Sequence, residues 1–236
     1  MLSRKIIIGH RGIPSRVHEN TVESLLRAAV SGADMVELDI RQTADRVAVA
    51  YHDPAVDFPR DLRPLSTLTF DELRSATEKL GFSVPSISQV LKALSGKTKV
   101  LFEFKEKGYE EEIIKEVLGH FAKSDVAFQS FQGEIVNRIG MIDPDLTTGY
   151  LVEKASQLES AALSNAVFIA PSLAVLKKQR TFFETQKQSN RKIAVWTVDS
   201  SELIMECLND TLPDMLITNR CDEAARIQDQ LLSGTK

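Results

Sequence analysis

Two carboxylates alternate with apolar residues in the stretch MVELDI (35–40). Side chains of a β-strand point to its two faces in turn, so Glu37 and Asp39 share one face and the apolar residues share the other. Two like charges buried a strand repeat apart are costly unless a cation compensates for them. The stretch therefore predicts a cation site on the polar face of a strand.

A second stretch, VLFEFKE (100–106), adds a third carboxylate and an amine. Glu103 and Lys105 fall on one face of the expected strand, and the phenylalanines fall on the other. Converging carboxylates suit a hard divalent cation such as Mg²⁺ or Ca²⁺, whereas zinc prefers more nitrogen or sulfur ligands. We therefore expect Glu37, Asp39 and Glu103 to bind a divalent metal cation.

Two histidines and an arginine end other strand-like stretches. KIIIGHRG (5–12) closes on His10 and Arg11 between two glycines, and VAVAYHD (47–53) closes on His52. Two histidines beside a metal can work as an acid–base pair, in which one removes a proton and the other delivers one. A guanidinium fork matches phosphate oxygens. The pattern leaves open which histidine is the acid.

The elements that must position these residues alternate along the 236-residue chain. β-Rich runs occur at 5–10, 35–40, 99–104, 126–131, 148–153, 167–171, 192–198 and 214–219. Stretches of helical period separate them, at 21–31, 109–122, 133–140, 155–165, 173–188, 200–209 and 221–233. This order predicts an α/β fold, a TIM (β/α)₈ barrel that forms a single domain over 1–236. A doubly wound open sheet is the rival, but GHRGIPSRVHEN is not a GxGxxG phosphate turn.

An insertion of about 41–85 interrupts this alternation between the second and third strands. Residues 47–53 are expected to pair as an extra strand beside the second, 53–69 to form a loop, and 70–77 to form a short helix. Chemistry in such barrels is built from the loops that follow the strands. We therefore expect the insertion to shape access of the substrate to the site.

Residues around the first helix and at later strand ends complete the candidate site. Asn20 is expected to cap the first helix, with Glu23 as its capping-box partner, and Glu19 to support the metal site without binding metal. Phe131 ends the β-rich run at 126–131, and Trp196 lies within the run at 192–198. We assign both to substrate binding as walls of the site, with core packing as the alternative.

Composition narrows the class of partner. The net charge is −4, so no basic field favours nucleic acid or an anionic membrane. No apolar stretch approaches the roughly 20 residues of a membrane span, and the N-terminus does not read as a signal peptide. Cys207 and Cys221 are expected to be reduced, packed thiols. These features predict a cytoplasmic protein, and they carry no information on its oligomeric state.

The motifs together resemble those of the glycerophosphodiester phosphodiesterase family. HRG at 10–12, ENT at 19–21, GAD followed by ELDI at 32–40, HD at 52–53 and LFEFK at 101–105 match its pattern. The resemblance implies a TIM barrel that uses a divalent cation to hydrolyse glycerophosphodiesters to glycerol 3-phosphate and an alcohol.

The resemblance also implies roles for individual residues. Glu37, Asp39 and Glu103 would bind the metal, and His10 and His52 would form the acid–base pair. Arg11 and Lys105 would hold the phosphate. Asn219 stands where the family usually has aspartate, and we expect this departure to lie away from the site residues.

Three alternatives remain. A lysophospholipase D-type enzyme would need an apolar lip, which the insertion offers in Phe58, Leu62, Leu65 and Phe70. An aldolase-like enzyme would use Lys105 as a Schiff-base nucleophile, which the nearby carboxylates disfavour because they raise the pKa of a lysine. A non-catalytic barrel would bind a phosphoryl ligand without turning it over.

Overall fold

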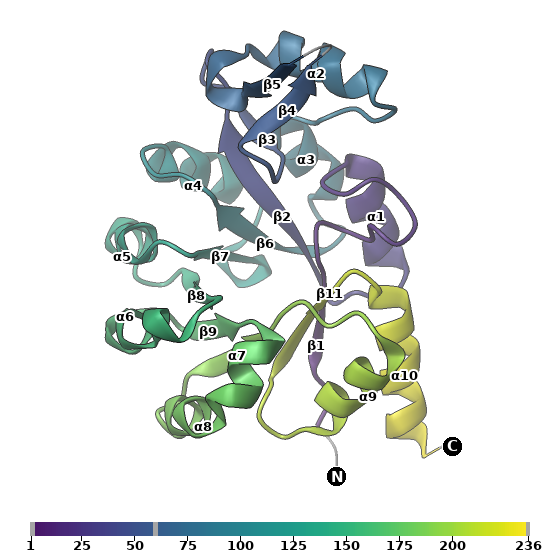
Figure 1. The fold of residues 1–236 in the computed structure, drawn as a ribbon, viewed down its shortest axis with the longest axis vertical. Helices are drawn as coiled ribbons and strands as arrows, with labels where there is room; N and C mark the ends of the chain where they lie inside the picture. Colours follow the sequence, from purple (N-terminus) through teal and green to yellow (C-terminus); the bar gives the residue numbers. More distant parts are fainter. Residues whose placement is uncertain (1–2, 59–60, 235–236) are drawn as a thin grey trace.

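A computed structural model describes residues 3–58 and 61–234. Within these ranges, eight parallel strands close into a barrel, in the order β1-β11-β10-β9-β8-β7-β6-β2, with β1 also paired to β2 (Figure 1). These strands are β1 (Ile6–Gly9), β2 (Met35–Gln42), β6 (Lys99–Phe104), β7 (Val126–Ser130), β8 (Thr147–Val152), β9 (Phe168–Pro171), β10 (Lys192–Val195) and β11 (Met215–Thr218). The predicted TIM barrel is confirmed.

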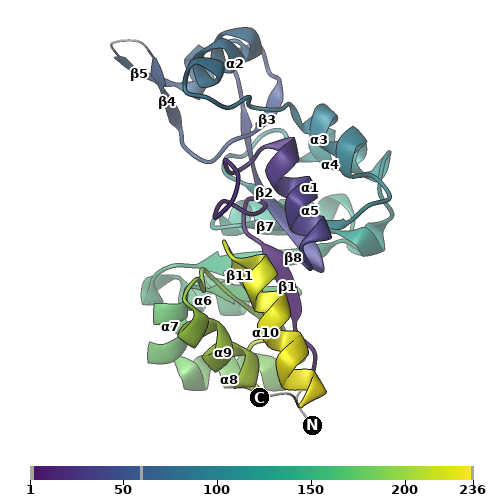
Figure 2. The same cartoon turned by 90° about the vertical axis from the view of Figure 1, so that its right-hand side faces the viewer.

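Helices cover the outside of the barrel (Figures 1 and 2). They are α1 (Val22–Val30), α3 (Ile87–Leu94), α4 (Glu110–Leu118), α5 (Gly133–Ile142), α6 (Leu158–Leu163), α7 (Leu173–Lys178), α8 (Arg180–Gln188), α9 (Ser201–Asn209) and α10 (Cys221–Ser233). The prediction of one helix over 173–188 is wrong, because Gln179 leaves the helical conformation (φ −119°, ψ 32°) and separates α7 from α8.

Two apolar layers follow from the alternation along the strands. The outer layer packs the strands against the helices and contains Val36, Leu38 and Phe102. The inner layer fills the barrel and contains Leu101 and Phe168. The predicted phase of the second and third barrel strands is therefore confirmed, and the polar residues that alternate with the outer layer point to the barrel axis.

The insertion between β2 and α3 has a core of its own. It contains β3 (Ala48–Ala50), β4 (Ala55–Phe58), β5 (Asp61–Pro64), the 3₁₀ turn η1 (Leu65–Thr67) and α2 (Phe70–Lys79). β3 pairs antiparallel with β2, as predicted. The prediction of a loop over 53–69 is wrong, because β4 and β5 pair as an antiparallel ribbon over a small apolar cluster. The insertion lies at the end of the molecule opposite the chain termini (Figure 2).

Both cysteines lie on helices, as predicted. Cys207 on α9 and Cys221 on α10 are buried free thiols. Burial raises the pKa of each to about 11, so both stay protonated near neutral pH. Among the helices described here, none is long and apolar enough to cross a membrane.

Candidate active site

Neighbouring strands β2 and β6 bring the three predicted carboxylates together. Their parallel register places Asp39 beside Glu103, with Glu37 one strand repeat earlier on the same inward face. Glu37 and Asp39 are fully buried, and Glu103 is 5% exposed. One oxygen of each carboxylate lies within 4.8 Å of the other two. A buried, all-oxygen cluster of this size fits a hard divalent cation.

The ionisation of the three carboxylates is consistent with a cation-binding site. Burial and the charges of Asp39 and Glu103 raise the pKa of Glu37 well above its usual value. Burial, followed by the Asp39 charge, raises the pKa of Glu103 to about 7. Glu37 Oε1 is buried and has no hydrogen-bond partner among the described residues. A divalent cation would be coordinated by this oxygen and would relieve the repulsion between the carboxylates.

Two side-chain cations flank the cluster. Lys105 Nζ lies 2.8 Å from Asp39 Oδ1 and donates a hydrogen bond to Glu103. Arg11 Nε lies 3.1 Å from Asp39 Oδ2, and its Nη1 lies 2.8 Å from Glu19 Oε1, so Glu19 supports the site through Arg11. Burial opposes ionisation of Asp39, but Lys105 and Arg11 outweigh it and lower its pKa.

The same contacts argue against a Schiff-base role for Lys105. Burial acts to lower its pKa, but the Glu103 and Asp39 charges outweigh burial and raise it above the ordinary value. The amine is therefore protonated at neutral pH and cannot attack a carbonyl. Its two carboxylate contacts and its place at the cavity suit a fixed positive charge instead.

The turn after β1 requires its two glycines. A Cβ on Gly12, where φ is +89°, would lie 2.4 Å from Ser24 Oγ, and one on Gly9 would lie 2.5 Å from the Gly12 carbonyl oxygen. This close packing against α1 holds Arg11 in the left-handed region (φ 52°). The Arg11 backbone N–H then donates to Glu37 Oε2 at 2.8 Å. Strain at the turn thus places a donor on a carboxylate of the cluster.

The prediction that Asn20 caps α1 is wrong. Thr21 is the cap, since its hydroxyl accepts a hydrogen bond from the Ser24 backbone N–H at 3.1 Å. Asn20 instead takes a left-handed conformation (φ 55°) and turns its buried amide inward. Its Nδ2 donates to Asp39 Oδ2 at 2.8 Å, and its Oδ1 accepts from the Asp39 backbone N–H at 3.1 Å. Asn20 therefore orients Asp39.

His10 is held by a chain of two hydrogen bonds. The chain runs through Asn219, which follows β11, to Asp199, which precedes α9. His10 Nδ1 lies 2.8 Å from Asn219 Oδ1, and Asn219 Nδ2 donates to Asp199 Oδ2 at 2.6 Å. Because a carboxylate only accepts, the Asn219 amide nitrogen must face Asp199 and its oxygen must face His10. The expectation that Asn219 lies away from the site residues is wrong.

This arrangement fixes the tautomer of His10. Its Nδ1 donates to Asn219, which leaves Nε2 as an acceptor. Burial and the Arg11 charge lower the pKa of His10, so the ring is neutral near pH 7. A neutral imidazole with a free Nε2 can accept a proton.

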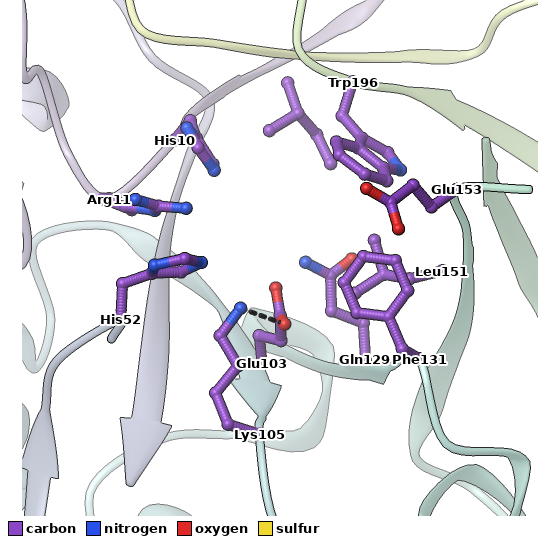
Figure 3. Close-up of a pocket in the computed structure, with 11 residues that line it drawn as sticks. His10, Arg11, His52, Glu103, Lys105, Gln129, Phe131, Leu151, Glu153 and Trp196 are labelled. Atoms are coloured by element: carbon purple, nitrogen blue, oxygen red, sulfur yellow. Dashed lines mark hydrogen bonds and ion pairs between the residues drawn. The ribbon is translucent and has the colours of Figure 1, made fainter. Parts of the chain in front are cut away.

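His52 follows β3 and reaches the same space from the insertion side. Its Nδ1 lies 2.8 Å from Asp53 Oδ1, and its backbone carbonyl accepts from Arg41 Nε at 2.7 Å. Figure 3 shows His52 beside Arg11 and above Lys105, with His10 across from Glu103. Its side chain is 35% exposed, so His52 stands at the rim of the site.

One cavity of about 230 Å³ is lined by five of these side chains, His10, Arg11, His52, Glu103 and Lys105 (Figure 3). Phe131 and Trp196 form its opposite wall, with ring centroids 5.5 Å apart in an edge-to-face arrangement. Trp196 Nε1 donates to the Ala170 carbonyl oxygen at 2.6 Å, which fixes the indole. The structure thus places both aromatic residues at the cavity, in contact with the inner apolar layer.

Two further polar residues of the cavity were not predicted from the sequence. Gln129 on β7 is 2% exposed, and its Oε1 has no hydrogen-bond partner within the part of the chain that the structure describes. Glu153 follows β8 and also faces the cavity (Figure 3). Strand phase could have found both, because Gln129 is in phase with Phe131, and Glu153 with Leu151.

The apolar lip expected on the insertion is not formed as predicted. Leu65 is buried in the small core of the insertion, and Phe70 packs against that core. Leu62 is 66% exposed and lines a second cavity beside His52. The side chain of Phe58 lies outside the described part of the chain.

Comparison with known proteins agrees with the fold and with the predicted family. The sequence model of the glycerophosphoryl diester phosphodiesterase family matches residues 10–223. The chain is 32% identical to YhdW of Bacillus subtilis over 164 residues, which are 61% of this chain and 65% of YhdW. It is 26% identical to the glycerophosphodiester phosphodiesterase of Caldanaerobacter subterraneus over 222 residues, which are 84% of this chain and 88% of that protein.

A solved structure shares the fold. An Oleispira antarctica phosphodiesterase, in complex with the product sn-glycerol-3-phosphate, superposes with a TM-score of 0.79 at 20% identity and covers 95% of this chain and 96% of its own. The chain matches just under two thirds of YhdW but most of the Caldanaerobacter and Oleispira proteins. Since the family match spans nearly the whole barrel, the chain belongs to the glycerophosphoryl diester phosphodiesterase family and is an enzyme of that family.

Proposed function

We propose that this enzyme hydrolyses glycerophosphodiesters to glycerol 3-phosphate and an alcohol, with Mg²⁺ or Ca²⁺ as its cofactor. One observation carries the proposal, namely the buried cluster of Glu37, Asp39 and Glu103. Its member Glu103 lines one cavity together with two histidines and two side-chain cations. Family membership supports it, as do the name of the Caldanaerobacter relative and the product bound to the Oleispira phosphodiesterase.

The metal would be held by Glu37, Asp39 and Glu103. When bound, a divalent cation neutralises phosphate charge and stabilises the charge that develops in the transition state. The protein supplies the rest of the binding: Arg11 offers a planar fork to the phosphate oxygens and Lys105 offers a point charge. Asn20 and the Arg11 backbone N–H keep the Asp39 and Glu37 carboxylates in place.

The acid and the base follow from the hydrogen bonds of the two rings. His10 is neutral with a free Nε2, so it accepts the proton of the attacking oxygen, which is water or the neighbouring glycerol hydroxyl. His52 Nδ1 lies 2.8 Å from the Asp53 carboxylate, which orients this ring at the rim of the cavity. We therefore assign His52 to protonate the departing alcohol oxygen as its bond to phosphorus breaks.

The glycerol moiety would lie against Phe131 and Trp196. Aromatic faces cover the carbon skeleton of such a small polyol, and its hydroxyls need polar partners. Gln129 Oε1 and the Glu153 carboxylate face the same space and can accept those hydrogen bonds. The cavity thus offers an apolar wall and acceptors on one side and cations on the other.

The test is release of glycerol 3-phosphate from glycerophosphocholine and glycerophosphoethanolamine, with Mg²⁺ or Ca²⁺ and with EDTA. His10→Ala and His52→Ala are expected to lower kcat at least about a hundredfold. A lack of metal-dependent glycerol 3-phosphate release from any glycerophosphodiester would refute the substrate assignment. Turnover of lysophosphatidylcholine at the rate of glycerophosphocholine would favour the lysophospholipase D alternative.

A further inference from the structure

The position of His52 in the site depends on how the loop that carries it is attached to the barrel. Among the described residues, the only hydrogen-bond or ion-pair partner of its ring is Asp53, the next residue of the same loop, whose side chain is 67% exposed. A contact within one loop orients the ring but cannot hold that loop against the barrel. The backbone of the loop must therefore be held by other contacts.

Strand β2 supplies those contacts. The Tyr51 backbone N–H donates to the Asp39 carbonyl oxygen at 3.1 Å. The His52 carbonyl oxygen accepts from Arg41 Nε at 2.7 Å. Arg41 lies two residues after Asp39 on the same strand, and its side chain is only 11% exposed. The strand that carries two carboxylates of the cluster, Glu37 and Asp39, therefore also holds the loop of the second histidine.

Glu106 in turn fixes the guanidinium of Arg41. The ladder between β2 and β6 ends at the pair of Ile40 and Phe104, and the ion pair between Arg41 Nη1 and Glu106 Oε1 joins the two chains beyond that point. Tyr109 Oη lies 3.1 Å from the Ile40 carbonyl oxygen and 3.4 Å from Glu106 Oε2. Burial and the Glu106 charge raise the pKa of Tyr109, so its hydroxyl stays protonated and can donate to either oxygen.

We propose that Arg41 is a positioning residue that acts through His52, with Glu106 holding Arg41 in place. This inference rests on the proposed function, in which His52 protonates the departing alcohol oxygen. Arg41 does not itself line the cavity of the site, so its effect on the reaction passes through His52. A general acid must lie within hydrogen-bond reach of the oxygen that it protonates, and a displacement of about 1 Å can lower the rate about a hundredfold.

The first experiment compares two leaving groups in Arg41→Gln. The choline oxygen of glycerophosphocholine needs a proton as it departs, whereas p-nitrophenolate leaves the p-nitrophenyl ester of glycerol 3-phosphate without one. The variant should lower kcat for glycerophosphocholine about tenfold or more, with KM and the kcat for the nitrophenyl ester both within about twofold of wild type. An equal loss of kcat for both substrates, or no loss for either, would overturn the proposal.

The second experiment combines Arg41→Gln with His52→Ala. The double variant should have the kcat of His52→Ala alone, because Arg41 has no role once the ring is gone; a further tenfold loss would overturn the proposal. Arg41→Lys should also lose activity, since one nitrogen cannot replace two separate donors, and full activity would contradict the two-point hold. Arg74→Gln is the matched control and should keep the wild-type kcat, because Arg74 is an ion-paired arginine of the insertion that lines neither cavity beside His52.

The third experiment does not depend on turnover. The chain has four histidines, so the ring resonances of His52 can be assigned in NMR spectra by comparison with His52→Ala. In the metal-free protein, Arg41→Gln and Glu106→Ala should shift or broaden these resonances and leave those of His10 in place, while Arg74→Gln should move neither. Unmoved His52 resonances in Arg41→Gln would overturn the proposal. Moved resonances, in a chain whose wild type hydrolyses no glycerophosphodiester, would refute the proposed function and leave the hold of Arg41 on His52 standing.

Discussion

Replacement of Glu103 by glutamine should make the metal-free enzyme more stable while it removes the metal site. Glu103 is buried among like charges, and its pKa is raised from 4.5 to about 7. A carboxyl whose pKa is raised on folding costs stability once the unfolded chain has ionised. The cost is absent below about pH 4.5, grows as the pH rises, and is complete above about pH 7.

The size of this effect follows from the same values. Each pH unit between the two pKa values corresponds to about 1.4 kcal/mol, so the ionised Glu103 costs about 3 kcal/mol above pH 7. Glutamine keeps the shape and cannot ionise. In a chain of this size, 3 kcal/mol corresponds to a melting-temperature increase of about 6–12 °C.

The assay is thermal and urea unfolding in EDTA at pH 4.5 and pH 8.5. Glu103→Gln should match the wild type at the lower pH and exceed it by up to about 3 kcal/mol at the higher one. Added Mg²⁺ or Ca²⁺ should stabilise the wild type and not the variant. Glu153→Gln, an exposed carboxylate at the same cavity, is the control and should change stability by less than about 0.5 kcal/mol. A variant less stable than the wild type at pH 8.5 in EDTA would refute the reasoning.

Other predictions concern the supports of the site. Asn219→Ala should release His10 and lower kcat about tenfold to a hundredfold with little change in KM; unchanged kcat would contradict the assigned tautomer. Gly12→Ala should destabilise the fold by more than about 2 kcal/mol in urea unfolding, since its Cβ meets Ser24; a smaller loss would mean that the turn can shift. Arg11→Lys should raise KM about tenfold, because a single ammonium replaces the fork, and a wild-type KM would exclude phosphate contact. Metal affinity, measured by calorimetry, should fall as the pH drops from 8 to 6, because protons compete at Glu103, and a constant affinity would argue against this ligand.

Strand phase explains why so much of the site could be predicted. Alternation along β2 and β6 places Glu37, Asp39, Glu103 and Lys105 on the inward face whatever the rest of the chain does, because the apolar face must meet the helices. The same rule would have found Gln129. The order of strands and helices was also predictable, since a parallel barrel of this length leaves few other ways to connect them.

Predictions from local sequence patterns were wrong where residues distant in the sequence compete for the same side chain. Asn20 has the chemistry of a helix cap, but the Asp39 carboxylate and backbone N–H on β2 offer its amide two hydrogen bonds, and Thr21 takes the cap. The ribbon of β4 and β5 was missed because its residues pack on a small core of the insertion, formed from segments separated in sequence.

The sequence by itself determined the barrel, the inward carboxylates and the residues able to carry out acid–base chemistry, because these depend on a period of two and on residue type. The tertiary structure alone decided what each group does. The tautomer of His10 depends on Asn219 and Asp199, more than 180 residues away along the chain. The place of His52 between two cavities depends on how the insertion folds against the loop after β1. Hydrogen bonds and electric fields act through space, so their partners are known only once the chain has folded.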